Sequence, residues 1–467
     1  MRHYRIMRYR VLFATAEYEP VVKVGGLGEA GRGLVSGLRQ LGIDVQVVMP
    51  DYGNLPVEPS GSEVTLAVPE WAGTASAQQV ATESGDELTV LRMPAIERPH
   101  PYNEPASGHA WADNDRRFFG FSAAVAALAD EMRPDVVHLN DWHTAVVPAL
   151  LQQPRPTVLT VHNAAYQGAA DSGWVNVLRN HHATYLQDGS LNPLAGAVSV
   201  CDRIVAVSDG YADDLRRGSV ANLMSRCRQR GSHLLGIRNG IDTRYWDPAH
   251  NPHLPSSFDH NDLSGKEICR KELVRRTTLN DDDQPIIAVV ARLVEQKGID
   301  LALGLVPFLD TLGAKLVIIG DGEVELVARA ARTAGTQPGR VHFFGKYSDA
   351  TAALVMAGSD LLLVPSRFEP CGLTQMQAMR FGTIPIVTAV GGLGETVIDV
   401  DRHPDRGNGF VAATADTVHV LDAAHRAVRW ISDARRRRAL QRRGMQSDWS
   451  WGPQARRYAD VYDELVS

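Results

Sequence analysis

Short apolar runs alternate with amphipathic stretches along most of the chain. The runs are rich in Val, Ile and Leu and are bounded by polar or glycine-containing turns, a pattern typical of buried strands. We predict strands at 11–16, 45–49, 88–93, 135–139, 157–161, 203–207, 234–237, 285–290, 315–319, 341–344, 361–364 and 384–388. Strands that alternate with helices imply βαβ units, so we expect an α/β protein built on parallel sheets with right-handed crossovers.

One segment interrupts this alternation. Residues 247–262 are rich in Pro, His, Asn and Asp and show no periodicity, so we interpret them as a linker. A chain of 467 residues is also too long for one ordinary core. We therefore predict two doubly wound, Rossmann-like domains, 1–246 and 247–450, that face a ligand cleft. Further helices are predicted at 417–431, 433–444 and 452–465.

Composition and charge argue against several classes of protein. The net charge of −6 disfavours nucleic acid as a main partner. Four cysteines are scattered without CxxC spacing, which argues against a zinc site or a disulfide scaffold and suits the reducing cytoplasm. No apolar stretch approaches the roughly 20 residues that a membrane-spanning helix needs. We therefore expect a cytoplasmic protein with no membrane span.

The stretch 364–397 contains the strongest chemical signal. An acid, Glu369, lies in a polar turn directly after a strand, and a helix is predicted to begin near Gly372. The next strand leads into a second glycine turn, Gly391-Gly392. Amides at the start of a helix bind anions, and the carboxyl ends of parallel strands meet at one edge of a sheet. A carboxylate beside such amides suits a ligand with both hydroxyls and phosphates, such as a sugar nucleotide.

Two cations follow another predicted strand. Arg292 and Lys297 come directly after the strand 285–290, and a fork donor with a point charge suits a diphosphate. Two surface cations without a ligand would give the same pattern. The run 281–283 has the D-x-D spacing of metal-dependent glycosyltransferases, but it precedes its strand, so we interpret it as a solvated turn.

The first half of the chain contains weaker signals of the same kind. Lys23, Gly25 and Gly26 lie in a glycine loop that suits a phosphate, although a tight turn without a ligand fits equally well. Asp141 and His162 each follow a predicted strand, which places them at the ligand edge of the sheet. No GxSxG, HExxH or kinase signature supports a hydrolase, protease or kinase.

Taken in order, a series of motifs resembles those of the bacterial glycogen synthases and plant starch synthases. They are KVGGLGE at Lys23, NDWHT at Asn140, HNAAYQG at His162, NGIDTRYWDP at Asn239, DLSGKEICRKEL at Asp262, ARLVEQKGIDL at Ala291, SRFEPCGLTQMQAMRFGTIPIV at Ser366 and GGLGETV at Gly391. The resemblance covers nearly the whole chain. It implies the GT-B fold and the retaining transfer of a sugar from a nucleotide, with the last helix, 451–467, crossing back to the first domain.

The resemblance also implies roles for the matched residues. His162 would lie beside the anomeric carbon, and Glu369 would hold sugar hydroxyls. Arg292 and Lys297 would neutralise the diphosphate leaving group. Tyr347 would lie against the nucleotide base. Substrate-binding positions are predicted at Lys23, Gly25, Gly26, Asp141, Asn239, Tyr347, Cys371, Gly372, Leu373, Thr374, Gly391 and Gly392.

The expected reaction is a front-face retaining transfer, because no carboxylate is obviously placed as a nucleophile on the far face of the sugar. The leaving phosphate would help to deprotonate the acceptor. Arg292 and Lys297 would stabilise the charge that develops on the diphosphate. We therefore expect neither a metal nor a cofactor besides the nucleotide-sugar donor.

Two acceptors stay open at this point. The first reading is transfer of glucose from ADP-glucose to the non-reducing end of an α-1,4-glucan. The second is transfer from a UDP- or GDP-sugar to a small acceptor, because Val24, Glu29, Ala164 and the segment 219–230 depart from the family pattern. A catalytically silent binding protein is disfavoured by the full set of matched charged residues. The sequence indicates no oligomeric state.

Overall fold

The computed structural model describes residues 9–105 and 107–467. The chain forms two compact units: the first comprises the residues up to Gly240 together with Trp451–Ser467, and the second comprises Ile241–Ser450. The sequence placed the first boundary after Trp246, a few residues beyond the one observed. The expected α/β architecture, with parallel sheets in two domains, is confirmed.

The first unit is built on a nine-stranded sheet in the order β11-β10-β7-β6-β1-β2-β5-β4-β3. Neighbours from β11 to β5 are parallel, whereas β4 and β3 extend the edge in antiparallel pairs. β6 and β7 are buried at every position, which is why runs without alternation marked them in the sequence. The strands are β1 (Arg10–Ala14), β2 (Asp44–Pro50), β3 (Glu58–Leu66), β4 (Ala75–Ala81), β5 (Glu87–Arg92), β6 (Val136–Asn140), β7 (Thr157–Val161), β10 (Arg203–Ala206) and β11 (Leu234–Gly236), with β8 (Leu186–Gln187) and β9 (Ser190–Leu191) paired separately.

The antiparallel edge of this sheet was not expected from the sequence. β3 is exposed at every position except Leu66, so it contains no apolar run. It is held by backbone pairing with β4, and the register shifts between Pro59 and Glu63. An exposed edge strand of this kind is invisible to hydrophobic patterning, because its stability comes from the backbone and not from burial.

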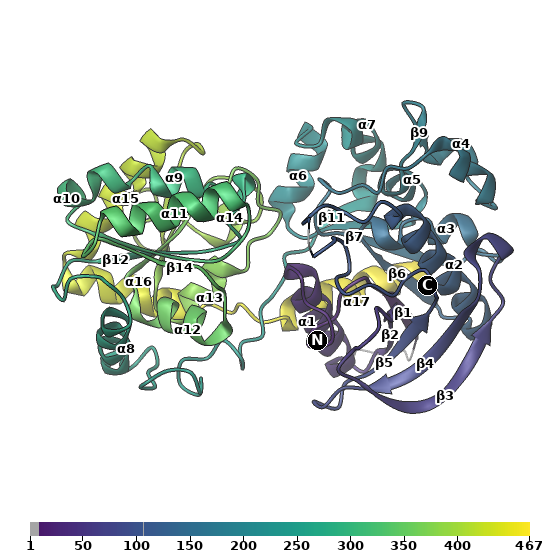
Figure 1. Ribbon diagram of the computed structural model, residues 1–467, viewed down its shortest axis with the longest axis horizontal. Helices are drawn as coiled ribbons and strands as arrows, with labels where there is room; N and C mark the ends of the chain where they lie inside the picture. Colours follow the sequence, from purple (N-terminus) through teal and green to yellow (C-terminus); the bar gives the residue numbers. More distant parts are fainter. Residues whose placement is uncertain (1–8, 106) are drawn as a thin grey trace. The chain divides into compact units, whose positions relative to one another are not determined.

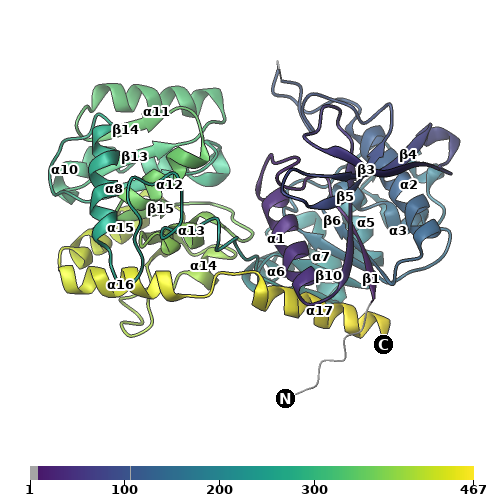
Figure 2. The ribbon, with the colours of Figure 1, turned by 90° about the horizontal axis from the view of Figure 1, so that it is seen from below.

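Helices cover the sheet of the first unit, and α17 rejoins this unit after the chain has passed through the second. α17 packs against α1, and Figure 2 shows the two helices meeting at an angle. A Cβ atom at Gly33 of α1 would collide with the indole ring of Trp451, and one at Gly37 would lie 2.8 Å from Cβ of Ala455. These two glycines therefore allow the close packing of the two helices. The α-helices of this unit are α1 (Gly26–Gln40), α2 (Asn114–Met132), α3 (Val147–Leu150), α4 (His182–Tyr185), α5 (Pro193–Val200), α6 (Asp209–Arg217), α7 (Ala221–Arg230) and α17 (Gly452–Val466).

The second unit is built on a six-stranded, wholly parallel sheet in the order β14-β13-β12-β15-β16-β17. α9 and α11 lie on one face of this sheet, and α8, α12 and α13 lie on the other (Figure 1). The strands are β12 (Ile286–Val290), β13 (Lys315–Ile319), β14 (Val341–Phe344), β15 (Leu361–Val364), β16 (Ile384–Thr388) and β17 (Phe410–Ala412). The α-helices are α8 (Ser264–Arg275), α9 (Ile299–Leu303), α10 (Leu309–Leu312), α11 (Val324–Thr336), α12 (Asp349–Gly358), α13 (Thr374–Arg380), α14 (Leu393–Thr396), α15 (Thr417–Ile431) and α16 (Ala434–Gln446).

The segment interpreted as a linker, 247–262, belongs to the second unit. Phe258 is buried within it, and Asp247 forms an ion pair of 3.3 Å with Arg380 of α13. The segment lacks periodicity because side chains fix it one at a time, without regular secondary structure. In the part of the chain that the structure describes, no helix has both the length and the apolarity to cross a membrane.

Candidate functional site

The strand order of the first unit reverses between β1 and β6. β2 continues on one side of β1, while β6 and then β7 follow on the other. The carboxyl ends of β1, β6 and β7 therefore lie side by side, at the kind of edge where open α/β sheets bind ligands. The loops after these strands contain the glycine loop, Asp141 and His162. The topology thus gathers the polar groups predicted in the first half of the chain.

A buried acid, Glu17, holds the glycine loop. One carboxylate oxygen, Oε2, accepts hydrogen bonds from the N–H groups of Val24 at 2.7 Å and Gly25 at 3.0 Å. The other, Oε1, accepts one from the hydroxyl of Tyr102 at 2.7 Å. Gly25 caps the start of α1, and a Cβ atom there would meet nothing within 4 Å. Glu17 therefore fixes the backbone of the loop, while the space beside Gly25 stays open.

Lys23 lies in the same loop and is partly exposed. Its ammonium is 3.0 Å from Glu19 and 3.4 Å from Glu29, the acid in the first turn of α1. The lysine is thus held over the loop between two carboxylates. This arrangement keeps a positive charge beside the glycine loop, although each pair is exposed enough to be weak.

Asp141 follows β6 and is buried, and its backbone has a positive φ of 54°. Its Oδ1 accepts hydrogen bonds from the N–H groups of His162 at 2.7 Å and Asn163 at 3.3 Å. Burial raises the pKa of Asp141 to about 7, against the effect of these two hydrogen bonds, which lower it. Its carboxyl ties the end of β6 to the loop after β7.

The orientation of the His162 ring follows from one neighbour. Asn140 donates from Nδ2 to the carbonyl of Ala14 at 3.0 Å, so its Oδ1 is left to face Nε2 of His162 at 2.9 Å. His162 therefore carries its hydrogen on Nε2 and presents Nδ1 as an acceptor. Burial lowers the pKa of His162 to about 3, which keeps the ring neutral near pH 7.

Asn239 does not join this group. It is buried in the segment after β11, the edge strand two places along the sheet from β7. In the described part of the chain no hydrogen bond joins it to Asp141 or His162. The topology thus separates this predicted position from the two strand-end residues.

In the second unit, the strand order reverses between β12 and β15. The loops after these two strands are joined to each other. The N–H of Arg367 donates to the carbonyl of Gln296 at 2.9 Å, and the Gln296 side chain donates to the carbonyl of Phe368 at 2.9 Å. Arg367 also forms a bidentate pair with Asp300, with both N–O distances at 2.7 Å. The two loops therefore form one braced surface at the ligand edge.

Lys297 and Glu369 lie opposite each other on this surface. The Lys297 ammonium is 2.6 Å from Oε2 of Glu369, and the Ser366 hydroxyl donates to the same oxygen at 3.1 Å. Glu369 is 8% exposed. Lys297 and Ser366 both donate to one of its carboxylate oxygens and so hold the carboxylate in place. Its other carboxylate oxygen makes no hydrogen bond that the structure records within the described residues. A hydroxyl-bearing ligand would find an oriented acceptor there.

The glycine turn 391–392 packs against the loop that contains Glu369. A Cβ atom at Gly391 would overlap the carbonyl oxygen of Glu369, and one at Gly392 would overlap that of Cys371. Gly391 also has a φ of 44°, a conformation that favours glycine. These glycines therefore pack closely against the loop that contains Glu369, here called the acid loop, and support it. The sequence did not predict this role for them.

The helix predicted to begin near Gly372 is α13, which begins at Thr374. Gly372 adopts a φ of 71° and turns the chain into this helix. The N–H groups of Gly372, Leu373 and Thr374 donate to no other group among the described residues. They lie directly after Cys371, which is buried. Three backbone donors are thus available close in sequence to Glu369.

Arg292 and Tyr347 are the most exposed of the predicted residues in this unit. Arg292 follows β12, and its side chain has no hydrogen-bonding or ionic partner in the described part of the chain. Tyr347 follows β14, the edge strand, and is 40% exposed. Two strands, β13 and β12, separate β14 from β15. Tyr347 therefore lies along the same sheet edge as Glu369 but not beside it.

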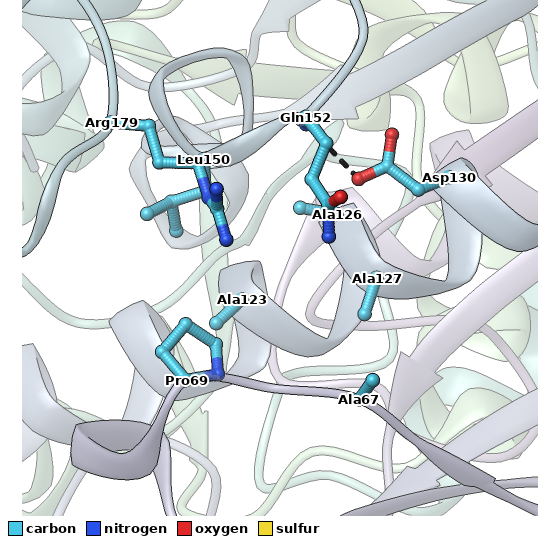
Figure 3. A pocket seen from close by; sticks show the side chains of 9 residues that line it. All are labelled: Ala67, Pro69, Ala123, Ala126, Ala127, Asp130, Leu150, Gln152 and Arg179. Carbon is cyan, nitrogen blue, oxygen red and sulfur yellow. Dashed lines mark hydrogen bonds between the residues drawn. The ribbon is translucent and has the colours of Figure 1, made fainter.

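Two other features of the described residues concern possible ligands. No group of three or more His, Cys, Asp and Glu side chains gathers there in the way that would hold a metal ion. A shallow pocket of the first unit lies against α2 and has none of the predicted residues in its wall (Figure 3). Its wall includes Ala123, Ala126, Ala127, Leu150 and Arg179.

Comparison with known proteins identifies the family. Residues 10–227 match the starch synthase catalytic domain, and residues 270–446 match the glycosyl transferases group 1. The glycogen synthase of Halorhodospira halophila is 37% identical over 98% of this chain and 99% of its own length. That of Granulibacter bethesdensis is 34% identical over the same shares. The chain belongs to the glycogen synthase family.

Solved structures agree with this family assignment. The catalytic domain of starch synthase IV from Arabidopsis thaliana, bound to ADP and acarbose, has a TM-score of 0.88 and 30% identity, covering 98% of this chain and 99% of that one. Sucrose-phosphate synthase from Thermosynechococcus elongatus has a TM-score of 0.62 at 19% identity over the same shares, and so shows the fold alone. The GT-B fold is therefore confirmed, and this glycogen synthase family member is a glycosyltransferase. The full-length relatives do not favour the reading with a small acceptor.

The structure adds residues that sequence reasoning missed in this family member. Glu17, Tyr102, Asn140 and Ser366 each hold a predicted residue or loop in place. Glu17 had a usable signal, since it comes directly after an apolar strand as the predicted acids do. Tyr102 had none, because 85 positions separate it from Glu17 in the sequence.

Proposed function

We propose that this protein transfers glucose from ADP-glucose to the non-reducing end of an α-1,4-glucan, with retention of configuration. The observation that carries the proposal is the oriented Lys297–Glu369 pair, 2.6 Å apart, in which Glu369 lies close in sequence to the available N–H groups of residues 372–374. Such an arrangement offers an acceptor for sugar hydroxyls and donors for phosphate. Support for glucose and glucan comes from relatives named glycogen synthase, which match over nearly their whole length.

The second unit is proposed to bind the donor. Arg292 and Lys297 would stabilise the diphosphate, as cations do for charge that develops on a leaving group. Glu369 would accept hydrogen bonds from sugar hydroxyls. The N–H groups of residues 372–374 would bind a phosphate, and Tyr347 would lie against the base. The glycine turn 391–392, which supports the acid loop, would also line the donor site.

The first unit is proposed to act on the sugar and the acceptor. His162 is neutral and presents Nδ1 as a hydrogen-bond acceptor, which suits a sugar hydroxyl better than a phosphate. Asp141 would position this ring through its hydrogen bond with the backbone N–H of His162. Lys23 and the open side of the glycine loop at Gly25 and Gly26 would contribute to phosphate binding. Asn239, in the segment after β11 of the same unit, would bind the donor or the acceptor.

The proposed step exchanges one bond at the anomeric carbon for another. The bond from C1 to the diphosphate oxygen breaks, and the electron pair leaves with ADP. The acceptor hydroxyl oxygen bonds to C1 on the same face, and its proton passes to an oxygen of the departing phosphate. Arg292 and Lys297 supply the charge stabilisation during this step, so we propose that no metal and no further cofactor are needed.

A panel assay tests this function. ADP-, UDP- and GDP-glucose are each incubated with the enzyme, with and without glycogen, and nucleotide release is measured. We expect release from ADP-glucose that depends on glycogen and that persists in EDTA. Binding of nucleotides without any glycogen-dependent turnover would overturn the glucan acceptor, and loss of turnover in EDTA would overturn metal independence.

The proposal extends to the location of the protein. A cytoplasmic location rests on the four cysteines, which are scattered without CxxC spacing and are all buried. Fractionation of the source cells with an antibody to the protein would test it, and recovery from the periplasmic or extracellular fraction would contradict it.

A further inference from the structure

Lys266, on α8 of the second unit, is a buried lysine. Only 6% of the residue is exposed to solvent. Lysine is among the residues least often buried, because taking an ammonium out of water is costly unless its hydrogens all find acceptors. A buried lysine therefore needs a structural explanation, and the family motif around it supplied none.

Four oxygen atoms surround the Lys266 ammonium. The carbonyls of Met356 and Ala357 lie at 3.3 and 2.8 Å, the carbonyl of Phe381 at 3.0 Å and the hydroxyl of Thr383 at 2.8 Å. Met356 and Ala357 lie in the last turn of α12, and Phe381 is the C-cap residue that follows α13. The three ammonium hydrogens thus serve the carboxyl ends of two helices, whose last carbonyls have no partner within their own helix.

The environment keeps the lysine charged near neutral pH. Burial lowers the pKa of Lys266 to about 8, and the Asp360 carboxylate opposes that change. The other groups that face it are Glu267, Cys269 and Arg270 of its own helix. Below pH 8 the ammonium form prevails. A cation at the carboxyl ends of helices interacts favourably with their dipoles.

The amino ends of the same two helices lie next to residues that are predicted to bind the donor. Tyr347 lies just before Ser348, the N-cap residue of α12, whose hydroxyl accepts a hydrogen bond from the N–H of Thr351 at 3.2 Å. α13 begins directly after Gly372 and Leu373. Each of these short helices rises about 1.5 Å per residue, so its length fixes the distance between its two ends. Whatever fixes their carboxyl ends therefore also sets where Tyr347 and the N–H groups of residues 372–374 lie.

We infer that Lys266 is a positioning residue for the donor: by clamping the carboxyl ends of α12 and α13 together, it sets the spacing between Tyr347 and the N–H groups before α13. The inference rests on the proposed function, because it takes these groups as the base and phosphate contacts of ADP-glucose. Lys266 itself touches no substrate. Its loss should therefore act on donor affinity and leave the chemical step largely intact.

The test compares Lys266→Met with Lys271→Met. Lys271 is exposed on the same helix, so its replacement removes the same charge and nearly the same shape without touching the clamp. We expect Lys266→Met to raise the KM for ADP-glucose and the Kd for ADP about tenfold, with kcat within about twofold of wild type. The KM for glycogen should stay unchanged, and Lys271→Met should match wild type. A merely structural lysine would instead reduce the active fraction, and so lower kcat while leaving both KM values as they were.

A milder variant decides the matter if Lys266→Met does not fold. Thr383→Val keeps the side-chain shape and removes one of the four oxygens, and we expect it to raise the donor KM about threefold. Donor KM values that match wild type in the folded variants would overturn the inference. Absence of ADP binding and turnover in the wild-type protein would instead overturn the proposed function, and this inference with it.

Discussion

The two units present opposite kinds of chemistry at the edges of their sheets. In the first, Asp141 and His162 are buried, and burial moves the pKa of Asp141 up to about 7 and that of His162 down to about 3. In the second, Lys297 and Glu369 form an ion pair of 2.6 Å, and Arg292 is exposed. Desolvation thus favours the neutral forms of Asp141 and His162 in the first unit, whereas Lys297 and Glu369 of the second unit are held as an ion pair. A neutral ring acceptor such as His162 suits a sugar hydroxyl, whereas the cations Arg292 and Lys297 suit a diphosphate.

The largest effect of a substitution on activity is expected in the second unit. Glu369→Ala should lower kcat/KM for ADP-glucose by about a thousandfold, because it removes the oriented acceptor and leaves Lys297 without its partner. Steady-state kinetics with saturating glycogen would measure this. Glu295→Ala, an exposed acid in the loop after β12, is the matched control and should be near wild type. A loss below about tenfold in Glu369→Ala would break the assignment of donor chemistry to this unit.

The two glycine turns offer a second contrast. Gly391→Ala should lower the free energy of unfolding by about 3 kcal/mol, because its Cβ would overlap the Glu369 carbonyl and its φ is positive. Gly25→Ala should leave stability within about 0.5 kcal/mol, because a Cβ atom there meets nothing. Urea denaturation measures both. If Gly25→Ala were the more destabilising of the two, the glycine loop of the first unit would be structural and not a ligand surface.

In the first unit, His162 is expected to act without a change of its own protonation state. His162→Ala should lower kcat about a hundredfold, yet no inflection from His162 is expected between about pH 5 and pH 8. The reason is that its pKa of about 3 lies below that range, so the ring is already neutral throughout. An inflection near pH 6.5 that vanishes in His162→Ala would show a charged histidine and would erase the contrast with the second unit.

The smallest effect concerns Asp141 and is one of pH dependence. Its pKa is about 7 in the folded protein and about 3.9 in an unfolded chain, so the folded state binds the extra proton between these values. Its contribution to stability is therefore fully present below about pH 4 and is lost as pH rises through 7. In Asp141→Asn this decline should disappear, which unfolding at about pH 5 and pH 7.5 would measure. An unchanged pH dependence would mean that Asp141 is ionised in the folded protein.

The parallel core of the fold was readable from the sequence because burial on both faces demands apolar runs. The strands at 157–161, 341–344 and 361–364 have the bounds that their runs predicted. β3 was missed because it is exposed, and 247–262 was taken for a linker because scattered anchors such as Phe258 leave no period. Pattern reasoning finds what repeats, and these segments are fixed by single contacts.

The sequence predicted site residues where a polar group follows a strand, but it did not predict the groups that hold those residues in place. Ser366 fixes Glu369 from three positions away, and nothing in its type distinguishes it from other turn serines. Asn140 determines the tautomer of His162 through a bond across neighbouring strands. Such contacts depend on how strands align, which the order of residues along the chain does not express.

The return of α17 to the first unit has a consequence for folding during synthesis. The ribosome completes the whole of Ile241–Ser450 before it makes the helix that packs on Gly33 and Gly37 of α1. The second unit is continuous in sequence and can fold as soon as it emerges, whereas the first must wait with the glycine face of α1 uncovered. The domain that is translated first is therefore the one that is finished last.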